Sequence, residues 1–333
     1  MLFFVLSGFV IFHSVAVNPL DLNLRNYAVK RIRRIYPIFL CALAISYLCQ
    51  EISIRSFGAP DWRLLMGNLA MLQDVGLKPG VWFFTFYDRP LWSLSYECWF
   101  YVLFIALIQL QIAPHRRQFL AALISLVGVL SYLAFPNQAS LFLMYFMIWW
   151  CGAELAREYA ECGRITCRRQ LLPIGMLTAL ATLWWVPLIK AVLEHDPLQL
   201  DTYPALICRH IFAAIGFICV GILWYRIGFL WFDRLLGGFA IFAPISYAMY
   251  AIHSPIIVAA NSFSPGHHSA IKIVCSFALT LGLAWLLERR LQPAVNRWTK
   301  RFLNYGPAPK ASSRRPGFGR FASRPQAAAA EAG

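Results

Sequence analysis

The chain has 333 residues, of which 59% are apolar and only 14% are charged. Soluble globular domains carry roughly 45–50% apolar and about 25% charged residues, so the composition excludes a soluble two-domain enzyme, an intrinsically disordered chain and a fibrous repeat. The 30 Lys and Arg residues outnumber the 15 acidic residues and give a net charge of +15. The composition therefore predicts an all-α fold, a polytopic bundle of membrane helices.

Nine apolar runs are candidates for transmembrane helices, because about 20 apolar residues cross a hydrocarbon core of about 30 Å. The predicted spans, joined by short loops, are 2–17, 35–50, 91–113, 118–135, 140–156, 171–189, 205–225, 239–262 and 270–288. A further segment, 62–72, is too short to span, and we interpret it as an interfacial or re-entrant piece.

The loops after every second span hold most of the basic residues. If the side after the first span is taken as the inside, the inner loops and the C-terminal segment carry 23 of the 30 Lys and Arg residues. The positive-inside rule then predicts a bacterial inner-membrane protein with its N-terminus outside and its C-terminus in the cytoplasm. Because the topology accounts for most of the positive charge, we expect membrane lipids as partners and no nucleic acid.

The two ends of the chain differ in character. Residues 306–333 are rich in Pro, Ala, Ser and Arg without apolar periodicity, which predicts a disordered, basic cytoplasmic tail. Residues 1–305 form the predicted membrane domain. Met1 is followed at once by an apolar run with no basic flank, so we expect this domain to be N-terminally incomplete, lacking an upstream helix.

A basic stretch, 30–37, leads into the second span. Pro37 fits the first turn of a helix, so we predict that the helix begins near it. If the preceding stretch is also helical, Arg31 and Arg34 share a face, and their planar guanidinium groups suit a phosphate. The alternative is a positive anchor that contacts anionic lipid headgroups.

The third span opens with a polar stripe. Ser93, Glu97 and Tyr101 are spaced at i, i+4 and i+8, so they lie on one face of a helix. Glu97 is about 9 Å from the outer end of the span. A carboxylate at this depth is costly, so we predict that it faces a partner or a wet cavity. A structural ion pair or hydrogen bond between two helices is the alternative.

The eighth span carries a second polar stripe, formed by Ser246, Tyr250 and His253 at i, i+4 and i+7. His253 lies at a depth in the outer half comparable with that of Glu97, and Pro255 is expected to kink the helix just beyond it. The alternative is a buried histidine that is hydrogen-bonded for packing and has no catalytic role. Arg209, near the outer end of the seventh span, binds an acidic group or, as we favour, snorkels to the interface.

The nine cysteines give no sign of a metal centre. Seven of them lie in or at the ends of spans, where they behave as small hydrophobic residues. No Cys-x-x-Cys or Cys/His spacing suggests zinc, so no metal site is predicted.

Five motifs in this order resemble those of the acyltransferase 3 family of integral-membrane acyltransferases. They are the segment 3–9, Arg31 and Arg34 before 35–37, the segment 92–101 with Glu97, the segment 245–253 with His253, and Glu288 with Pro293. The resemblance implies a ten-helix domain that takes an acyl group, often acetyl, from acyl-CoA on the cytoplasmic side. It implies transfer to a hydroxyl of a cell-surface carbohydrate or similar acceptor, with Arg31 and Arg34 at the donor site.

The chain departs from the family pattern at its beginning. Family members carry an additional first helix with an arginine and a histidine taken to be catalytic, and the motif at 3–9 belongs to the helix after it. We therefore expect either a start placed too far downstream or an inactive copy. His13 lies at the opposite end of its span and is not a substitute.

The leading functional hypothesis is a membrane O-acyltransferase with acyl-CoA, most simply acetyl-CoA, as co-substrate and a carbohydrate or lipid-linked sugar as acceptor. The residues predicted to be catalytic are Glu97 and His253, those predicted to bind the donor are Arg31 and Arg34, and those predicted to bind substrate are Ser93, Tyr250 and Arg209. The alternatives are a transporter or flippase of a lipid-linked or acylated substrate, and an inactive truncated family member.

Overall fold

The computed structural model describes residues 1–18, 22–194, 199–262 and 270–300. The described chain is overwhelmingly helical, with one pair of two-residue strands. The predicted tail, 306–333, and the end of the predicted membrane domain lie outside the described residues.

Eight helical stretches of the described chain are long and apolar enough to cross a membrane. They are Leu24–Ile54, Arg89–Gln109, Pro114–Ala134, Gln138–Cys162, Cys167–Leu193, Ala205–Arg226, Gly237–Ser262 and Ala270–Thr299. The first helix, Leu2–Val17, is apolar but shorter, with 16 residues. These helices coincide with the nine predicted spans, so the predicted helical membrane bundle is confirmed.

The elements follow one another in a simple order. They are α1 (Leu2–Val17), α2 (Leu24–Ile54), α3 (Trp62–Leu69), β1 (Gln73–Asp74), β2 (Phe83–Phe84), η2 (Arg89–Leu91), α4 (Trp92–Gln109), α5 (Pro114–Ala134), α6 (Gln138–Cys162), α7 (Cys167–Thr182), α8 (Trp185–Leu193), α9 (Ala205–Arg226), α10 (Phe232–Leu235), η3 (Gly237–Ile245), α11 (Ser246–Ser262), α12 (Ala270–Leu286), the π-helical η4 (Leu287–Leu291) and α13 (Gln292–Thr299).

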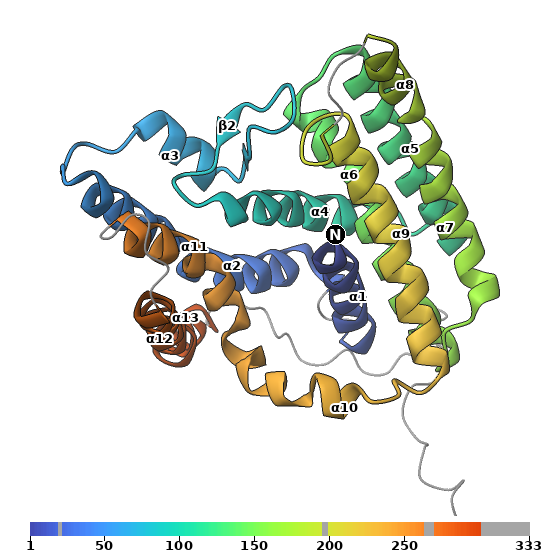
Figure 1. Ribbon diagram of the computed structural model, residues 1–333. Helices are drawn as coiled ribbons and strands as arrows, with labels where there is room; N and C mark the ends of the chain where they lie inside the picture. The colour runs from blue at the N-terminus through green and yellow to red at the C-terminus, as the bar shows by residue number, and fades with distance from the viewer. Residues whose placement is uncertain (19–21, 195–198, 263–269, 301–333) are drawn as a thin grey trace, which may run out of the picture.

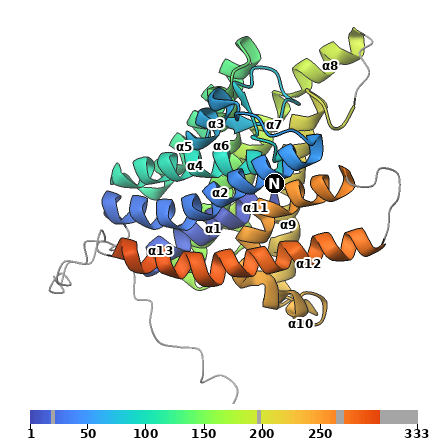
Figure 2. The same cartoon turned by 90° about the vertical axis from the view of Figure 1, so that its left-hand side faces the viewer.

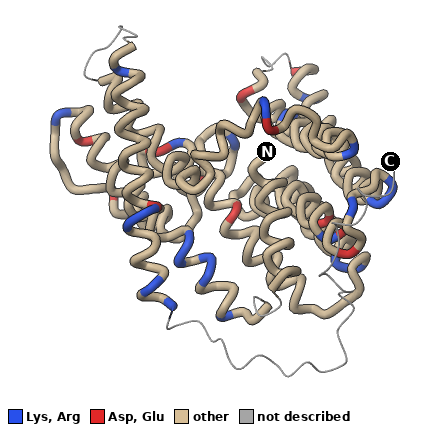
Figure 3. Tube along the Cα trace, turned by 90° about the horizontal axis from the view of Figure 1, so that it is seen from below, with Lys and Arg blue, Asp and Glu red and all other residues tan. Residues whose placement is uncertain are grey.

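The helices form two groups with α1 and α4 between them (Figures 1 and 2). One group contains α5, α6, α7 and α9, and the other contains α2, α11, α12 and α13. Helix α1 packs against α6, whereas α11 packs against both α2 and α12. Lys and Arg gather towards helix ends and connections, and the middles of the helices are mostly uncharged (Figure 3).

Two glycines allow α1 and α6 to approach closely. A Cβ atom at Gly8 would lie 2.0 Å from the carbonyl oxygen of Trp149, and one at Gly152 would lie 1.9 Å from that of Val5. Small residues at such a crossing bring helix backbones together in membranes. The approach places Ser7 of α1 beside α4 and α6, where the polar side chains described below meet.

Helix α6 is the most enclosed span of the described chain. In its apolar window 89% of the residues are buried, against 22–56% in the other spans. Its aromatic residues Phe146 and Trp149 stack, with ring centroids 6.0 Å apart, and Trp149 also contacts Phe104 of α4 edge-on. Helix α6 therefore faces protein rather than lipid on most of its surface.

Helix α2 begins 13 residues before Pro37, so the predicted start near Pro37 is wrong. The side chain of Asn23 caps the helix by accepting hydrogen bonds from the backbone N–H groups of Arg25 and Asn26, at 3.0 and 3.3 Å. Pro37 cannot donate to the carbonyl of Arg33 four residues earlier. The side-chain amide of Gln292 donates to that carbonyl instead, at 2.7 Å, so the helix continues through the proline.

The segment before α4 forms a small cap beside the start of that helix (Figure 1). The predicted re-entrant piece becomes α3, followed by the parallel pairing of β1 and β2. Lys78 and Asp74 of this cap form an ion pair at 3.0 Å, and both side chains are fully buried. The Lys78 ammonium lies 4.6 Å from the ring centroid of Trp92 and 5.3 Å from that of Tyr96. Burial lowers the pKa of Lys78, and the carboxylate of Asp74 opposes this effect.

Candidate active site

Glu97 lies in the first half of α4 and joins three helices. Its carboxylate oxygen Oε1 accepts hydrogen bonds from the hydroxyl of Ser7 on α1, at 2.7 Å, and from the hydroxyl of Tyr101 on α4. The indole N–H of Trp149 on α6 donates to the Ser7 hydroxyl oxygen at 3.1 Å. Glu97 is buried, with a relative exposure of 7%. Hydroxyl donors from α1 and α4 thus satisfy this carboxylate oxygen, an arrangement that fits both the predicted partner and the alternative of a hydrogen bond between helices.

Arg31 lies over two aromatic rings close to Glu97. Its guanidinium carbon is 5.3 Å from the ring centroid of Tyr27 and 5.6 Å from that of Tyr101. The charge of Arg31 acts on the Glu97 carboxylate without a direct ion pair in the described chain. Its Nε atom is buried and has no hydrogen-bond partner among the residues that the structure describes. Arg31 therefore keeps a free donor in the interior of the bundle.

Arg34 turns to a different partner. Its Nη1 atom lies 2.5 Å from Oε2 of Glu288, and its guanidinium carbon lies 5.5 Å from the ring centroid of Tyr247 on α11. The Glu288 side chain is only 3% exposed, whereas that of Arg34 is 45% exposed. The two arginines share one helix but do not converge on one point in the described chain, because stacking holds Arg31 and an ion pair holds Arg34.

Ser93 and Tyr250 connect the start of α4 to α11. The Tyr250 hydroxyl donates its single proton to the backbone carbonyl of Pro90, so in the 2.6 Å bond between the two hydroxyls Ser93 is the donor. The ring of Phe3 stacks on Tyr250 with centroids 6.0 Å apart. These two predicted substrate residues are therefore neighbours, one turn of α4 away from Glu97.

His253 lies on α11, one turn beyond Tyr250, and is half-buried. Its Nδ1 atom is 2.9 Å from the carbonyl oxygen of Tyr250 and 3.2 Å from that of Met249. Because a carbonyl oxygen only accepts hydrogen bonds, Nδ1 carries the proton in the neutral ring, and the lone pair is on Nε2. Nε2 has no hydrogen-bond partner among the described residues, which leaves it available as a base.

Asp88, just before η2, lies close to the same part of α11. The residue is fully buried, and neither carboxyl oxygen has a hydrogen-bond partner within the described chain. Burial raises the pKa of Asp88 from 3.8 to about 7, and the side chain of Ser254 opposes this rise. Asp88 is thus a titratable group beside the hydroxyl cluster of Ser93 and Tyr250.

The structure brings the predicted site residues together only in part. Glu97, Ser93 and Tyr250 lie along adjoining faces of α4 and α11, but no bond in the described chain links Glu97 to His253. Arg209 is exposed on α9 and makes no hydrogen bond or ion pair with the other predicted residues within the described chain. Its neighbour His210 instead bonds the Tyr145 hydroxyl through Nδ1 at 2.8 Å and stacks on Trp92.

Several polar residues of the site escaped sequence reasoning. Ser7 donates to Glu97, and Trp149 donates to Ser7. Glu288, which the sequence presents only as part of the last motif, pairs with Arg34. An acidic residue at the end of the last span is a signal that would have identified Glu288. Asp88 gave no such signal, because a loop aspartate is usually exposed.

No group of three or more His, Cys, Asp or Glu side chains in the described part of the chain is arranged to hold a metal ion.

Comparison with known proteins identifies the family. No curated protein and no solved structure gives a match. Residues 1–289 match the family model of the acyltransferase domain called acyltransferase 3. The matched region includes all the candidate residues described above. Because the match covers most of the chain, this protein, with its membrane-spanning helices, belongs to the acyltransferase 3 family.

Proposed function

We propose that the protein is a membrane O-acyltransferase that moves an acyl group, most simply acetyl, from acyl-CoA to a hydroxyl of a carbohydrate or lipid-linked sugar. Its family supports acyl transfer in a membrane. The observation that carries the proposal is the buried carboxylate of Glu97, held by Ser7 and Tyr101 within the charge field of Arg31. A buried ionisable group in a membrane bundle is characteristic of a functional site.

The donor binds from the arginine-rich side in this proposal. Arg31 and Arg34 lie about 10 and 15 Å along α2 from Leu24. Arg34 remains half-exposed while paired, and the Nε–H group of Arg31 has no hydrogen-bond partner in the described part of the chain. Both guanidinium groups suit the phosphates and carbonyl groups of acyl-CoA.

The acceptor binds near Ser93 at the start of α4 and Tyr250 of α11, about one helical turn from the Tyr247 ring that contacts Arg34. His253 Nε2 accepts the proton of the acceptor hydroxyl as general base, while Nδ1–H stays anchored on the Tyr250 carbonyl. The acceptor oxygen then forms a bond with the thioester carbonyl carbon, and the carbon–sulfur bond breaks. CoA leaves as a thiolate and takes up a proton. Glu97 orients and polarises the hydroxyl groups between the donor and acceptor ends.

We place the protein in the bacterial inner membrane with its C-terminal side in the cytoplasm, because most basic residues follow the inward ends of the helices. This orientation puts acyl-CoA, a cytoplasmic metabolite, on the side of the arginines. A reporter enzyme that is active only outside the membrane, fused after residue 333, is expected to be inactive.

Radiolabelled acetyl-CoA tests the reaction directly. Inverted membrane vesicles containing the protein are expected to transfer label covalently to a carbohydrate or lipid-linked sugar fraction, and mild alkali should release it as an ester does. Arg34→Ala and Glu97→Ala are expected to abolish the label, whereas the exposed Arg116→Ala is the matched control. Full activity in both site variants contradicts the assignment of the site. Label that resists alkali contradicts transfer to oxygen.

The same assay distinguishes a transporter or flippase. Such a protein moves its substrate without forming a bond, so label would cross the vesicle membrane without becoming covalently attached. Absence of covalent label in the wild type, with purified full-length protein present, contradicts acyl transfer by this chain.

A further inference from the structure

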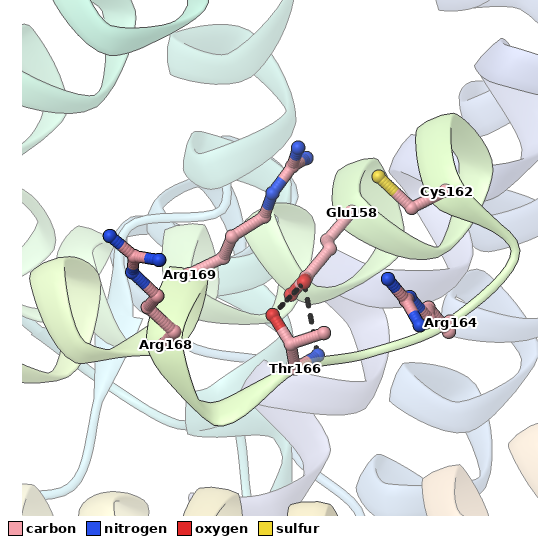
Figure 4. A pocket seen from close by; sticks show the side chains of 6 residues that line it. All are labelled: Glu158, Cys162, Arg164, Thr166, Arg168 and Arg169. Atoms are coloured by element: carbon pink, nitrogen blue, oxygen red, sulfur yellow. Dashed lines mark hydrogen bonds between the residues drawn. The ribbon is translucent and has the colours of Figure 1, made fainter.

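A pocket of about 570 Å³ opens where α6 ends and α7 begins, away from the candidate active site. It is lined by Glu158, Cys162, Arg164, Thr166, Arg168 and Arg169 (Figure 4). Glu158 lies nine residues, about 14 Å, beyond Trp149 along α6. The volume is within the range of about 300–1,000 Å³ that is typical of small-molecule sites.

The only carboxylate that lines this pocket is already satisfied by neutral donors. Oε1 of Glu158 accepts the backbone N–H and the hydroxyl of Thr166, at 3.0 and 2.5 Å. Oε2 accepts the side-chain amide of Gln170 at 2.6 Å. Glu158 is fully buried, so it braces the turn between the helices rather than pairing with an arginine.

The neighbouring acidic residues form ion pairs with other arginines. Glu154 pairs with Arg157 at 2.6 Å, and Glu161 pairs with Arg157 at 3.0 Å and with Arg169 at 3.3 Å. Arg164 and Arg168 are left without an ion pair or hydrogen bond in the described chain. The pocket is therefore lined by two guanidinium groups that have no ion pair within the described residues.

These two arginines lie on opposite sides of one hollow. Figure 4 shows Arg164 on one side of Glu158 and Thr166, with Arg168 on the other side. Arg226 at the end of α9 adds a third positive charge nearby, because its Nη1 atom lies 3.6 Å from Sγ of Cys167 at the start of α7. Both arginines line the same pocket, so each can donate charge-assisted hydrogen bonds to an anion bound in it.

We propose that this pocket binds a phosphate group between Arg164 and Arg168. The phosphate belongs either to an anionic phospholipid headgroup or to a soluble phosphate ester, since both present the same oxygens to a guanidinium. The site is separate from the residues proposed to carry acyl transfer, and it does not depend on that function.

The test uses the full-length protein and two probes. In neutral detergent, binding of glycerol 3-phosphate, a phosphate ester that lacks the nucleotide of CoA, is measured by calorimetry. In a second arm, retention of phosphatidylglycerol against phosphatidylcholine is measured by native mass spectrometry. Arg164→Gln/Arg168→Gln is expected to weaken binding at least about tenfold in one of the two arms, because charge-assisted hydrogen bonds are lost. The arm that shows the loss identifies the source of the phosphate.

The matched control is Arg116→Gln/Arg234→Gln, which removes the same charge from two exposed arginines outside the pocket. It is expected to bind both probes within about twofold of the wild type. An equal loss in the control, or equal binding by the wild type and the pocket variant in both arms, overturns the proposal. If the double variant folds poorly, the single variant Arg168→Gln is used instead, because it leaves the hydrogen bonds of Glu158 intact. It is also expected to bind the probe more weakly than the wild type does.

Discussion

The side-chain amide of Gln292 on α13 donates a hydrogen bond to the backbone carbonyl of Arg33 on α2 at 2.7 Å. That carbonyl is the one that Pro37 leaves without an intrahelical partner. In a membrane an unpaired backbone group is costly, and a neighbouring helix commonly supplies the missing bond. The bond therefore lets α2 carry Arg31 and Arg34 into the bundle as part of one continuous helix.

A double-mutant cycle tests this relationship. Gln292→Ala is expected to lower the free energy of unfolding by about 1–3 kcal/mol, because it leaves a buried carbonyl unpaired. In a Pro37→Ala background the restored N–H group satisfies Arg33, so the cost of Gln292→Ala should fall to less than half. Unfolding in mixed detergent micelles measures both values. Equal costs in the two backgrounds would show that the bond does not compensate for the proline.

Glu97 offers a substitution that separates charge from shape. Glu97→Gln keeps an oxygen that accepts from Ser7 and Tyr101 but removes the negative charge. Acyl transfer is expected to fall roughly 10- to 100-fold, while the unfolding midpoint stays the same or rises because no charge remains buried. Ser7→Ala should cost less activity, since Tyr101 still donates to Glu97. Full transfer by Glu97→Gln would assign the carboxylate a purely structural role.

Gly8 allows a matched pair of Gly→Ala substitutions. A Cβ at Gly8 meets the carbonyl oxygen of Trp149 at 2.0 Å, so Gly8→Ala must push α1 away from α6 and is expected to cost about 2 kcal/mol or more. Gly175 in α7 has nothing within 4 Å of the same atom. Gly175→Ala should be neutral or stabilising by about 0.5–1 kcal/mol. Similar unfolding midpoints for the two variants would mean that the close approach of α1 and α6 is dispensable.

Asp88 predicts a pH dependence of stability. Its pKa is about 7 in the folded protein and near 3.8 when exposed, so between about pH 4 and 7 the folded state binds the additional proton. The contribution of Asp88 is fully present below pH 4 and is lost as the pH rises through 7. Asp88→Asn stays uncharged and should be more stable than the wild type at pH 8, with little difference at pH 4.

Unfolding midpoints at pH 4, 6 and 8 measure the Asp88 effect. The exposed Asp201→Asn serves as the control for removing one acidic residue. A gap between Asp88→Asn and the wild type that is equal at all three pH values would contradict the predicted titration.

The membrane spans could be predicted from the sequence because the bilayer imposes a local requirement. An apolar run of sufficient length is visible without knowing its neighbours, and the polar stripe of Ser93, Glu97 and Tyr101 follows from helical periodicity alone. Tyr101 and Glu97 are indeed hydrogen-bonded across one turn. The roles predicted for the site residues are still predictions.

The start of α2 could not be predicted in the same way. The residue that compensates for Pro37 is Gln292, 255 positions later in the chain, and nothing near Pro37 indicates it. The same limit applies to Lys78, which a loop sequence suggests is exposed. Its burial depends on Trp92 and Tyr96 of α4, which only the folded arrangement brings over it.

The enclosure of α6 has a consequence for how the protein enters the membrane. Of the eight spans in the described chain, α6 has the lowest mean hydropathy, and it carries Glu154 and Glu158 near one end. The free energy of transferring such a segment from water into lipid is less favourable than that of its neighbours. Its retention in the bilayer therefore depends on α1 and α5, which pack against it. Damage to the close approach of α1 and α6 at Gly8 and Gly152 therefore reduces the amount of protein that is integrated during synthesis, before any finished molecule exists to unfold.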